Sequence, residues 1–193
     1  MLTLASSALG SDVTLPALAG HTRARFPLSL HVAPSGDAAL DAAARNAVAD
    51  WNSVGRSGLG TALFTVVDRS DADVLVGVEP TGPSGPMGFA VVDADPSGAI
   101  TLPVRITVAP PRPRGETPVD VLFYQVLAHE LGHALGLPHA TDVRSVMCCA
   151  RGVSLDDPAQ RTAYIAARRH PDLRSVEPQL VEHYGRFWNQ KKP

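Results

Sequence analysis

The feature that most constrains this chain is the segment from residue 129 to 139, which reads HELGHALGLPH. If the segment begins as a helix, His129 and His133 lie on the same face and can bind one metal ion together. Gly136 can then adopt a left-handed conformation, which ends the helix and turns the chain back, so that His139 becomes a third ligand. Glu130 cannot join the histidines as a ligand, but it can reach a water molecule bound to the ion, which suits it to proton transfer.

Three protein ligands indicate a catalytic metal site. A tetrahedral zinc ion held by three imidazoles keeps its fourth position open, whereas a structural zinc site is closed by four ligands. Zinc in such a site lowers the pKa of its bound water, and Glu130 can accept the proton during attack. On an ordinary amphipathic helix the same histidines would be plain surface or buried side chains, but the glycine and the third histidine at fixed offsets disfavour that interpretation.

The extended motif resembles that of the metzincin zinc metallopeptidases. Met147 lies eight residues after the last histidine, where metzincins carry their Met-turn, and no tyrosine follows it at the second position. This spacing is most similar to that of the matrixins, the matrix-metalloproteinase-like branch. Residues 181–185 also resemble the end of the matrixin C-terminal helix.

The resemblance implies a zinc-dependent endopeptidase that hydrolyses peptide bonds. Its metal ligands would be His129, His133 and His139. Glu130 would activate the metal-bound water, and Met147 would form an apolar floor under the metal. Two alternatives remain open, a zinc-holding peptide-recognition module without turnover and a hydrolase of another amide such as a cell-wall peptide. The presence of Glu130 beside intact ligands disfavours the pure binder.

The same resemblance implies an α+β fold. It would contain a twisted mixed sheet of about five strands, two long helices above the cleft and a smaller helical C-terminal subdomain. The chain of 193 residues, 45% of them hydrophobic, is long enough for one substantial core, so we expect a single catalytic domain over residues 1–193. Its expected parts are an extended or poorly ordered lead-in arm (1–26), an upper subdomain with the sheet and the active-site helix (27–139), and a lower subdomain with the Met-turn and the C-terminal helices (140–193).

Local patterns predict the individual elements. Short apolar and alternating runs predict strands over residues 27–33, 62–67, 72–78, 88–92 and 104–108. Helical spacing predicts helices over residues 37–53, from 117 through the first part of the motif, and over 158–170 and 175–184.

Glycines suggest where two of these helices end. We expect Gly55 and Gly58 to close the first helix and Gly185 to end the last one. His183 is then expected at the surface, and residues 186–193 are interpreted as a frayed tail.

By the resemblance, one predicted strand would also bind substrate. Gly88, Phe89, Ala90 and Val91 would form the edge strand beside the cleft and pair with an extended peptide. An unpaired edge offers backbone donors and acceptors to any peptide, whatever its side chains. From the sequence alone, an ordinary edge strand is the alternative.

Further metal sites are not expected. Asp93 and Asp95 could bind calcium, but Asp-x-Asp-Pro-Ser-Gly also reads as a plain turn, which we favour because oxygen ligands are not otherwise concentrated nearby. Many matrixins hold a second, structural zinc with several histidines in this region. No histidine occurs between His31 and His129, so we predict a single catalytic zinc.

Charge and hydropathy narrow the partners and the location. A net charge of -2 argues against a nucleic-acid partner. The resemblance implies a protein or peptide substrate, and we expect a monomer. No apolar run approaches the roughly 18 residues of a membrane span. The resemblance implies a secreted or extracellular protein, but the first residues do not read as a signal peptide, so a cytoplasmic location stays open. Cys148 and Cys149 are adjacent, and neighbours rarely meet disulfide geometry, so they say little about the redox compartment.

Overall fold

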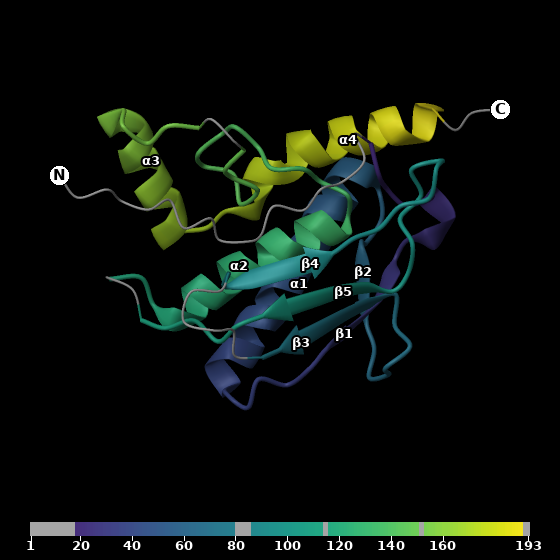
Figure 1. Cartoon of the computed structure of the whole chain (residues 1–193), viewed down its shortest axis with the longest axis horizontal. Coiled ribbons are helices and arrows are strands. Elements are labelled where there is room, and N and C mark those ends of the chain that lie inside the picture. Colours follow the sequence, from purple (N-terminus) through teal and green to yellow (C-terminus); the bar gives the residue numbers. More distant parts are fainter. Residues whose placement is uncertain (1–17, 80–85, 114–115, 151–152, 191–193) are drawn as a thin grey trace.

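A five-stranded mixed sheet forms one layer of the computed structural model, which describes residues 18–79, 86–113, 116–150 and 153–190 (Figure 1). The strand order is β2-β1-β3-β5-β4. All neighbouring pairs are parallel except β4 and β5, which are antiparallel. The predicted mixed sheet is therefore confirmed. The strands are β1 (Leu28–Val32), β2 (Phe64–Val66), β3 (Val74–Val78), β4 (Gly88–Val91) and β5 (Val104–Val108).

The alternating pattern of the strands buries one row of branched side chains. Leu28 and Leu30 of β1 are buried while their neighbours are less so, because successive side chains of a strand point to opposite faces. Leu30 lies beside Val74 of β3, and Val76 lies beside Ile106 of β5. These side chains belong to the same buried cluster as those of the two long helices, so the sheet and the helices share one core.

The first long helix, α1, spans Ala38–Leu59. It begins at Asp37, whose side chain accepts hydrogen bonds from two backbone N–H groups of the first turn. The predicted end at Gly55 and Gly58 is wrong, because the helix runs through both and ends at Gly60, where φ is 76°. A glycine inside a helix costs about 1 kcal/mol, which the packing of neighbouring buried side chains can offset.

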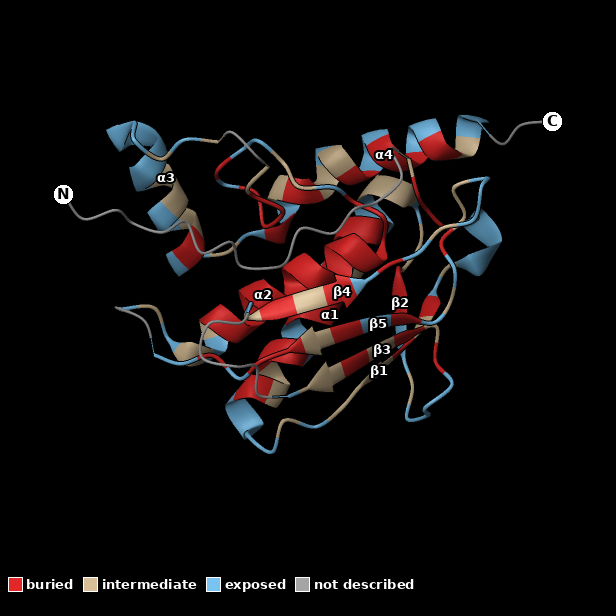
Figure 2. Ribbon diagram, in the orientation of Figure 1, coloured by how far each residue is buried: buried red, intermediate tan, exposed pale blue. Residues whose placement is uncertain are grey.

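The second long helix, α2 (Val119–Ala134), carries the motif and is buried along most of its length (Figure 2). Every residue from 122 to 134 is buried. Trp51 of α1 is fully buried and donates its indole N–H to the carbonyl oxygen of Ala128 at 3.0 Å, one residue before His129. Among the described helices, none is long and apolar enough to cross a membrane.

Helical segments follow the motif, namely α3 (Pro158–Arg169), the 3-10 helix η2 (Leu173–Val176) and α4 (Glu177–Gln190). The bounds of α3 agree with the prediction. Gly185 does not end α4, and residues 186–190, predicted as a tail, are helical. Tyr184 and Phe187 are buried on the inner face of α4, and this packing holds the helix past the glycine.

The segment from residue 18 to 26 is packed against the domain, so of the two predicted forms, an extended arm or a poorly ordered lead-in, the second is wrong for this part. Ala19 and His21 are buried, and the segment includes a 3-10 helix, η1 (Arg23–Arg25). His183, predicted at the surface, is also buried, and its Nε2–H donates to the carbonyl oxygen of Ala19 at 2.7 Å. The predicted arm from 1 to 17 and the predicted tail from 191 to 193 lie outside the described residues.

Cys148 and Cys149 form a disulfide. The expectation that neighbouring cysteines would not pair is therefore wrong for this chain. Cys148 is buried and directly follows Met147, so the disulfide belongs to the segment that comes after the motif.

Candidate metal centre

The three motif histidines converge on one point near the end of α2. The Nε2 atom of His129 lies 3.0 Å from Nε2 of His133 and 3.1 Å from Nε2 of His139, and the latter two atoms are 3.2 Å apart. Two nitrogens that are each ~2.0–2.1 Å from a tetrahedral zinc ion lie about 3.3 Å from one another. The triangle of nitrogens therefore has close to the size that zinc requires.

Backbone carbonyl groups determine the tautomers of two of these rings. Nδ1 of His129 lies 2.9 Å from the carbonyl oxygen of Val146, and Nδ1 of His133 lies 2.9 Å from that of Leu137. A carbonyl oxygen can only accept, so each Nδ1 carries the hydrogen and each Nε2 of a neutral ring presents a lone pair. Lone pairs that face one another repel unless a cation lies between them. This donor set fits a metal ion.

Burial keeps these rings neutral. It is the largest cause that lowers the pKa of His129 well below its ordinary value, and the neighbouring His133 lowers it further. Burial also lowers the pKa of His133 to about 4, although its hydrogen bond to Leu137 acts in the opposite direction. Neutral imidazole is the form that binds zinc, so at neutral pH neither Nε2 atom has to lose a proton before a metal ion can bind.

Gly136 makes the turn that brings His139 back to the other two rings. Its φ is 85°, and the N–H groups of Gly136 and Leu137 donate to the carbonyl oxygens of His133 and Gly132 at 2.8 and 3.0 Å. This is the Schellman arrangement that ends many helices. The helix thus ends where the spacing of the motif predicted.

The chain on both sides of the third histidine is held by other segments. Before His139, the side-chain amide of Gln179 in α4 donates to the carbonyl oxygen of Pro138 at 2.8 Å. After it, the N–H of Ala140 donates to the carbonyl oxygen of Met147 at 2.8 Å. These bonds limit the positions that the half-buried ring of His139 can take.

Glu130 is fully buried on α2, beside the edge strand β4. Burial raises the pKa of Glu130 to about 8, while the backbone N–H of Ala90 acts in the opposite direction. Neither carboxylate oxygen of Glu130 forms a hydrogen bond of normal geometry with any of the described residues, and this includes the N–H of Ala90. A buried carboxylate without a partner is costly, and such groups are concentrated at functional sites.

Met147 lies under the turn of α2 that carries the first two histidines. It is fully buried, and its sulfur occupies the space that a side chain at Gly132 would need. Its N–H donates to Oγ of Ser145 at 3.1 Å. The thioether is therefore part of the apolar packing below the motif.

The predicted substrate-binding residues form the edge strand β4. This strand is the last in the sheet order, and among the described residues no strand pairs with its outer side. Phe89 is half-buried and Val91 is 52% exposed. A Cβ atom at Gly88 would lie 2.5 Å from Cγ1 of Val126 and 3.1 Å from Cγ of Glu130, so β4 lies directly against α2.

Comparison with known families agrees with this arrangement. Residues 24–158, well over half of the chain, match the family model described as Matrixin. The chain belongs to the matrixin family. Matrixin membership implies a zinc-dependent metallopeptidase that acts on protein substrates, and the three-histidine cluster can hold the metal. Matrixins are typically extracellular. A comparison with curated proteins found no match.

The matrixin motif does not reveal the groups that orient it. The sequence did not predict that the carbonyl groups of Val146 and Leu137 hold the histidine rings, because a backbone carbonyl has no residue-type signal. Gln179 was missed as well, since it lies far along the chain from Pro138. One local hint was that Val146 directly precedes Met147, a residue that the sequence already predicted to lie near the metal.

The acidic loop after β4 forms a turn. The carboxylate of Asp95 accepts hydrogen bonds from the N–H and Oγ of Ser97 and from the N–H of Ala99, at 2.6 to 2.9 Å. This is the turn interpretation of the sequence. Calcium at Asp93 and Asp95 remains a disfavoured prediction.

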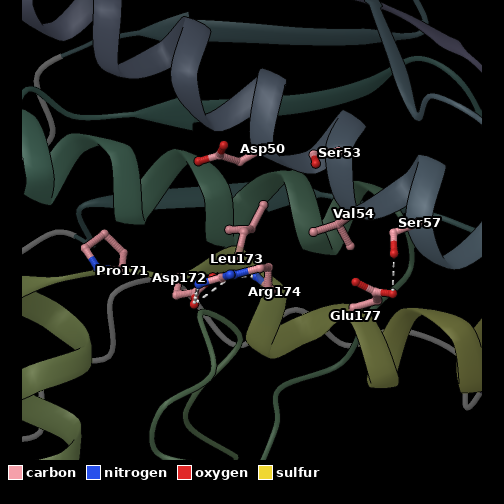
Figure 3. Close-up of a pocket in the computed structure, with 9 residues that line it drawn as sticks. All are labelled: Asp50, Ser53, Val54, Ser57, Pro171, Asp172, Leu173, Arg174 and Glu177. Carbon is pink, nitrogen blue, oxygen red and sulfur yellow. Dashed lines mark hydrogen bonds and ion pairs between the residues drawn. The ribbon is translucent and has the colours of Figure 1, made fainter.

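A hollow of about 260 Å³ lies between α1 and the segment that leads into α4 (Figure 3). Its polar groups are largely paired with one another. Oγ of Ser57 donates to Glu177 at 2.8 Å, and Arg174 donates to Asp172 at 2.7 to 3.1 Å. None of the motif histidines lines it, so this hollow is not part of the candidate metal centre.

Proposed function

We propose that this matrixin is a zinc-dependent endopeptidase. Its zinc ligands would be His129, His133 and His139, and Glu130 would be the general base. One observation carries the proposal. Three imidazole nitrogens lie within 3.2 Å of one another, and the residue after the first histidine is a buried carboxylate that has no hydrogen-bond partner in the described part of the chain.

Two backbone carbonyl groups would orient the helical zinc ligands. When bound, zinc would supply a Lewis acid that polarises a peptide carbonyl and lowers the pKa of water. The carbonyl groups of Val146 and Leu137 keep the Nδ1–H groups of His129 and His133 in place, so that both Nε2 atoms stay aimed at one point.

Glu130 would move the proton. Its Oε1 and Oε2 atoms have no hydrogen-bond partner among the described residues, so either oxygen can accept a proton from the attacking water and later release it to the departing amine nitrogen. Without metal, burial holds the pKa of Glu130 at about 8. A nearby dication would lower this pKa and favour the ionised carboxylate, which is the form that a base needs.

The substrate would lie extended along β4. Gly88, Phe89, Ala90 and Val91 offer the backbone of an edge strand, which can bind a peptide whatever its side chains. The close approach of Gly88 to Glu130 would bring the bound peptide near the base.

The proposal also covers Met147, the zinc content, the oligomeric state and the location. Met147 would act as the Met-turn floor under the metal, since its sulfur packs against Gly132 between the two helical ligands. We also propose one catalytic zinc per chain and a monomeric enzyme. We propose a location outside the cell as well, because matrixins are typically extracellular.

Substitution of Glu130 and His133 separates binding from chemistry. Glu130→Gln should keep about one zinc per chain but lower kcat/KM on casein or gelatin by at least about 100-fold, because the base is lost. His133→Ala should lose the zinc as well as the activity. Glu182→Gln, at a side chain that is 73% exposed, is the matched control and should behave as the parent.

Each alternative has its own outcome. Cleavage by Glu130→Gln at the parent rate would contradict the proposal. Bound zinc without cleavage across a peptide library would favour a recognition module. Cleavage restricted to cell-wall peptides would favour a hydrolase of that other class of amide.

A further inference from the structure

The helix α3 is attached to the domain by one buried arginine. The structure describes every residue of α3, and Arg168 is the only buried one, at 9% exposure. It lies beyond residue 158, where the family match ends. A buried guanidinium is costly unless it is paired, yet none of the ion pairs among the described residues includes Arg168. Its burial therefore needs another explanation.

The contacts of Arg168 lead to the segment that follows the motif. Nη2 of Arg168 donates to the carbonyl oxygen of Ser145 at 2.9 Å. Its guanidinium carbon lies 4.8 Å from the centre of the Tyr164 ring, which offsets part of the charge. The Nε atom of Arg168 has no hydrogen-bond partner within the described ranges. The charge is thus directed at one backbone carbonyl and not at a carboxylate.

That carbonyl adjoins the group that orients a zinc ligand. Ser145 is followed by Val146, whose carbonyl oxygen accepts from Nδ1 of His129. The side-chain amide of Gln125, one helical turn before His129, donates to the backbone carbonyl oxygen of Arg168. Both the helix that carries His129 and the segment that holds its ring are therefore attached to the last turn of α3.

We infer that Arg168 is a positioning residue for the metal site. By holding Ser145, it keeps the carbonyl of Val146 where it accepts from His129, and so it fixes the direction of Nε2 of His129. This inference rests on the proposed zinc site. Loss of a group that orients a metal ligand typically weakens metal binding about 10- to 100-fold.

Two other roles for Arg168 give different results. If Arg168 only anchors α3, its removal changes the stability of the fold but not the affinity for zinc. If its charge acts mainly by repelling the metal dication, its removal makes zinc bind more tightly. Positioning predicts weaker binding, so the sign of the change distinguishes the roles.

The test compares Arg168→Met and Arg168→Gln with the parent and with Arg169→Met. Arg169 is the matched control because it is the next residue of α3, is about half exposed and pairs with Glu116. The zinc dissociation constant is measured by chelator competition, and the visible absorption spectrum of the Co²⁺ form reports ligand geometry. Removal of Arg168 should raise the dissociation constant about 10- to 100-fold and alter the Co²⁺ bands. Arg168→Lys, which keeps the charge and one donor, should recover part of the affinity, and Arg169→Met should match the parent.

Several outcomes would overturn the inference. Parent-like or tighter zinc binding in folded Arg168→Met would do so, as would a Lys variant no better than the Met variant. Loss of folding in both the Met and the Gln variants would make Arg168 a residue of the fold alone. Failure of the parent itself to bind zinc would instead overturn the proposed function.

Discussion

The backbone of Gly136 packs directly against the carbonyl group of Ala19, so closely that a Cβ atom at position 136 would not fit. His183 of α4 donates to the same carbonyl at 2.7 Å. The turn that brings the third histidine to the metal centre is thus packed against a segment more than a hundred residues earlier in the chain. Its position depends on that packing as well as on its own left-handed backbone.

Gly136→Ala should weaken both the fold and the metal site. The left-handed φ of 85° costs an alanine about 1–2 kcal/mol, and the contact with Ala19 adds to this. We expect a loss of more than about 2 kcal/mol in the free energy of unfolding, measured in urea, and weaker zinc binding, measured by chelator competition. Gly36→Ala is the control, because φ there is 80° but no atom lies within 4 Å. Equal effects of the two substitutions would contradict the role of the Ala19 contact.

Gly88→Ala should impair activity without removing zinc. The new Cβ would lie 2.5 Å from Cγ1 of Val126 and 3.2 Å from Oε1 of Glu130, so either β4 or these side chains of α2 must shift. We expect kcat/KM to fall at least about tenfold, with a stability loss of about 1–3 kcal/mol and unchanged zinc content. Gly77→Ala on β3 is the matched strand control, since its nearest neighbour would be 3.6 Å away. Full activity in Gly88→Ala would count against the proposed position of the substrate.

The metal-free protein should be most stable near pH 6.5. Burial raises the pKa of Glu130 from 4.5 to about 8, so between these values the folded state holds a proton that the unfolded state lacks. Stability therefore falls as pH rises from 6.5 to 8, by about 2 kcal/mol from this group. Burial lowers the pKa of His133 from 6.5 to about 4, so the unfolded state holds the extra proton in that window and stability falls as pH drops.

Thermal unfolding of chelator-treated protein across pH 4–8 checks this prediction. Below pH 6.5, the stability lost through the buried histidines should exceed the stability gained through Glu130. The reason is that burial lowers the pKa of His129, His21 and His183 as well as that of His133. In metal-free Glu130→Gln the decline above pH 6.5 should disappear. A decline that persists in this variant would show that another group causes it.

The sequence predicted the parts of the protein that depend on neighbours along the chain. Helical geometry alone places His129 and His133 on one face, and the predicted strands over residues 72–78 and 104–108 match β3 and β5 closely. The mixed five-stranded sheet followed from the resemblance and is confirmed. Spacing is sufficient for the shared helix face and for the two strands because a turn of helix or a pleat of strand repeats over a few residues.

Tertiary structure decided which groups are buried and what they contact. The helix α4 continues through Gly185 because Tyr184 and Phe187 find a place in the core, and His183 is buried because Ala19 accepts its hydrogen. Arg168 contacts Ser145 only because α3 folds back beside α2. The sequence by itself determined which residues we propose as the metal ligands and the base. The carbonyl groups that orient them come from packing between distant segments, since burial and backbone partners depend on the whole fold and not on local spacing.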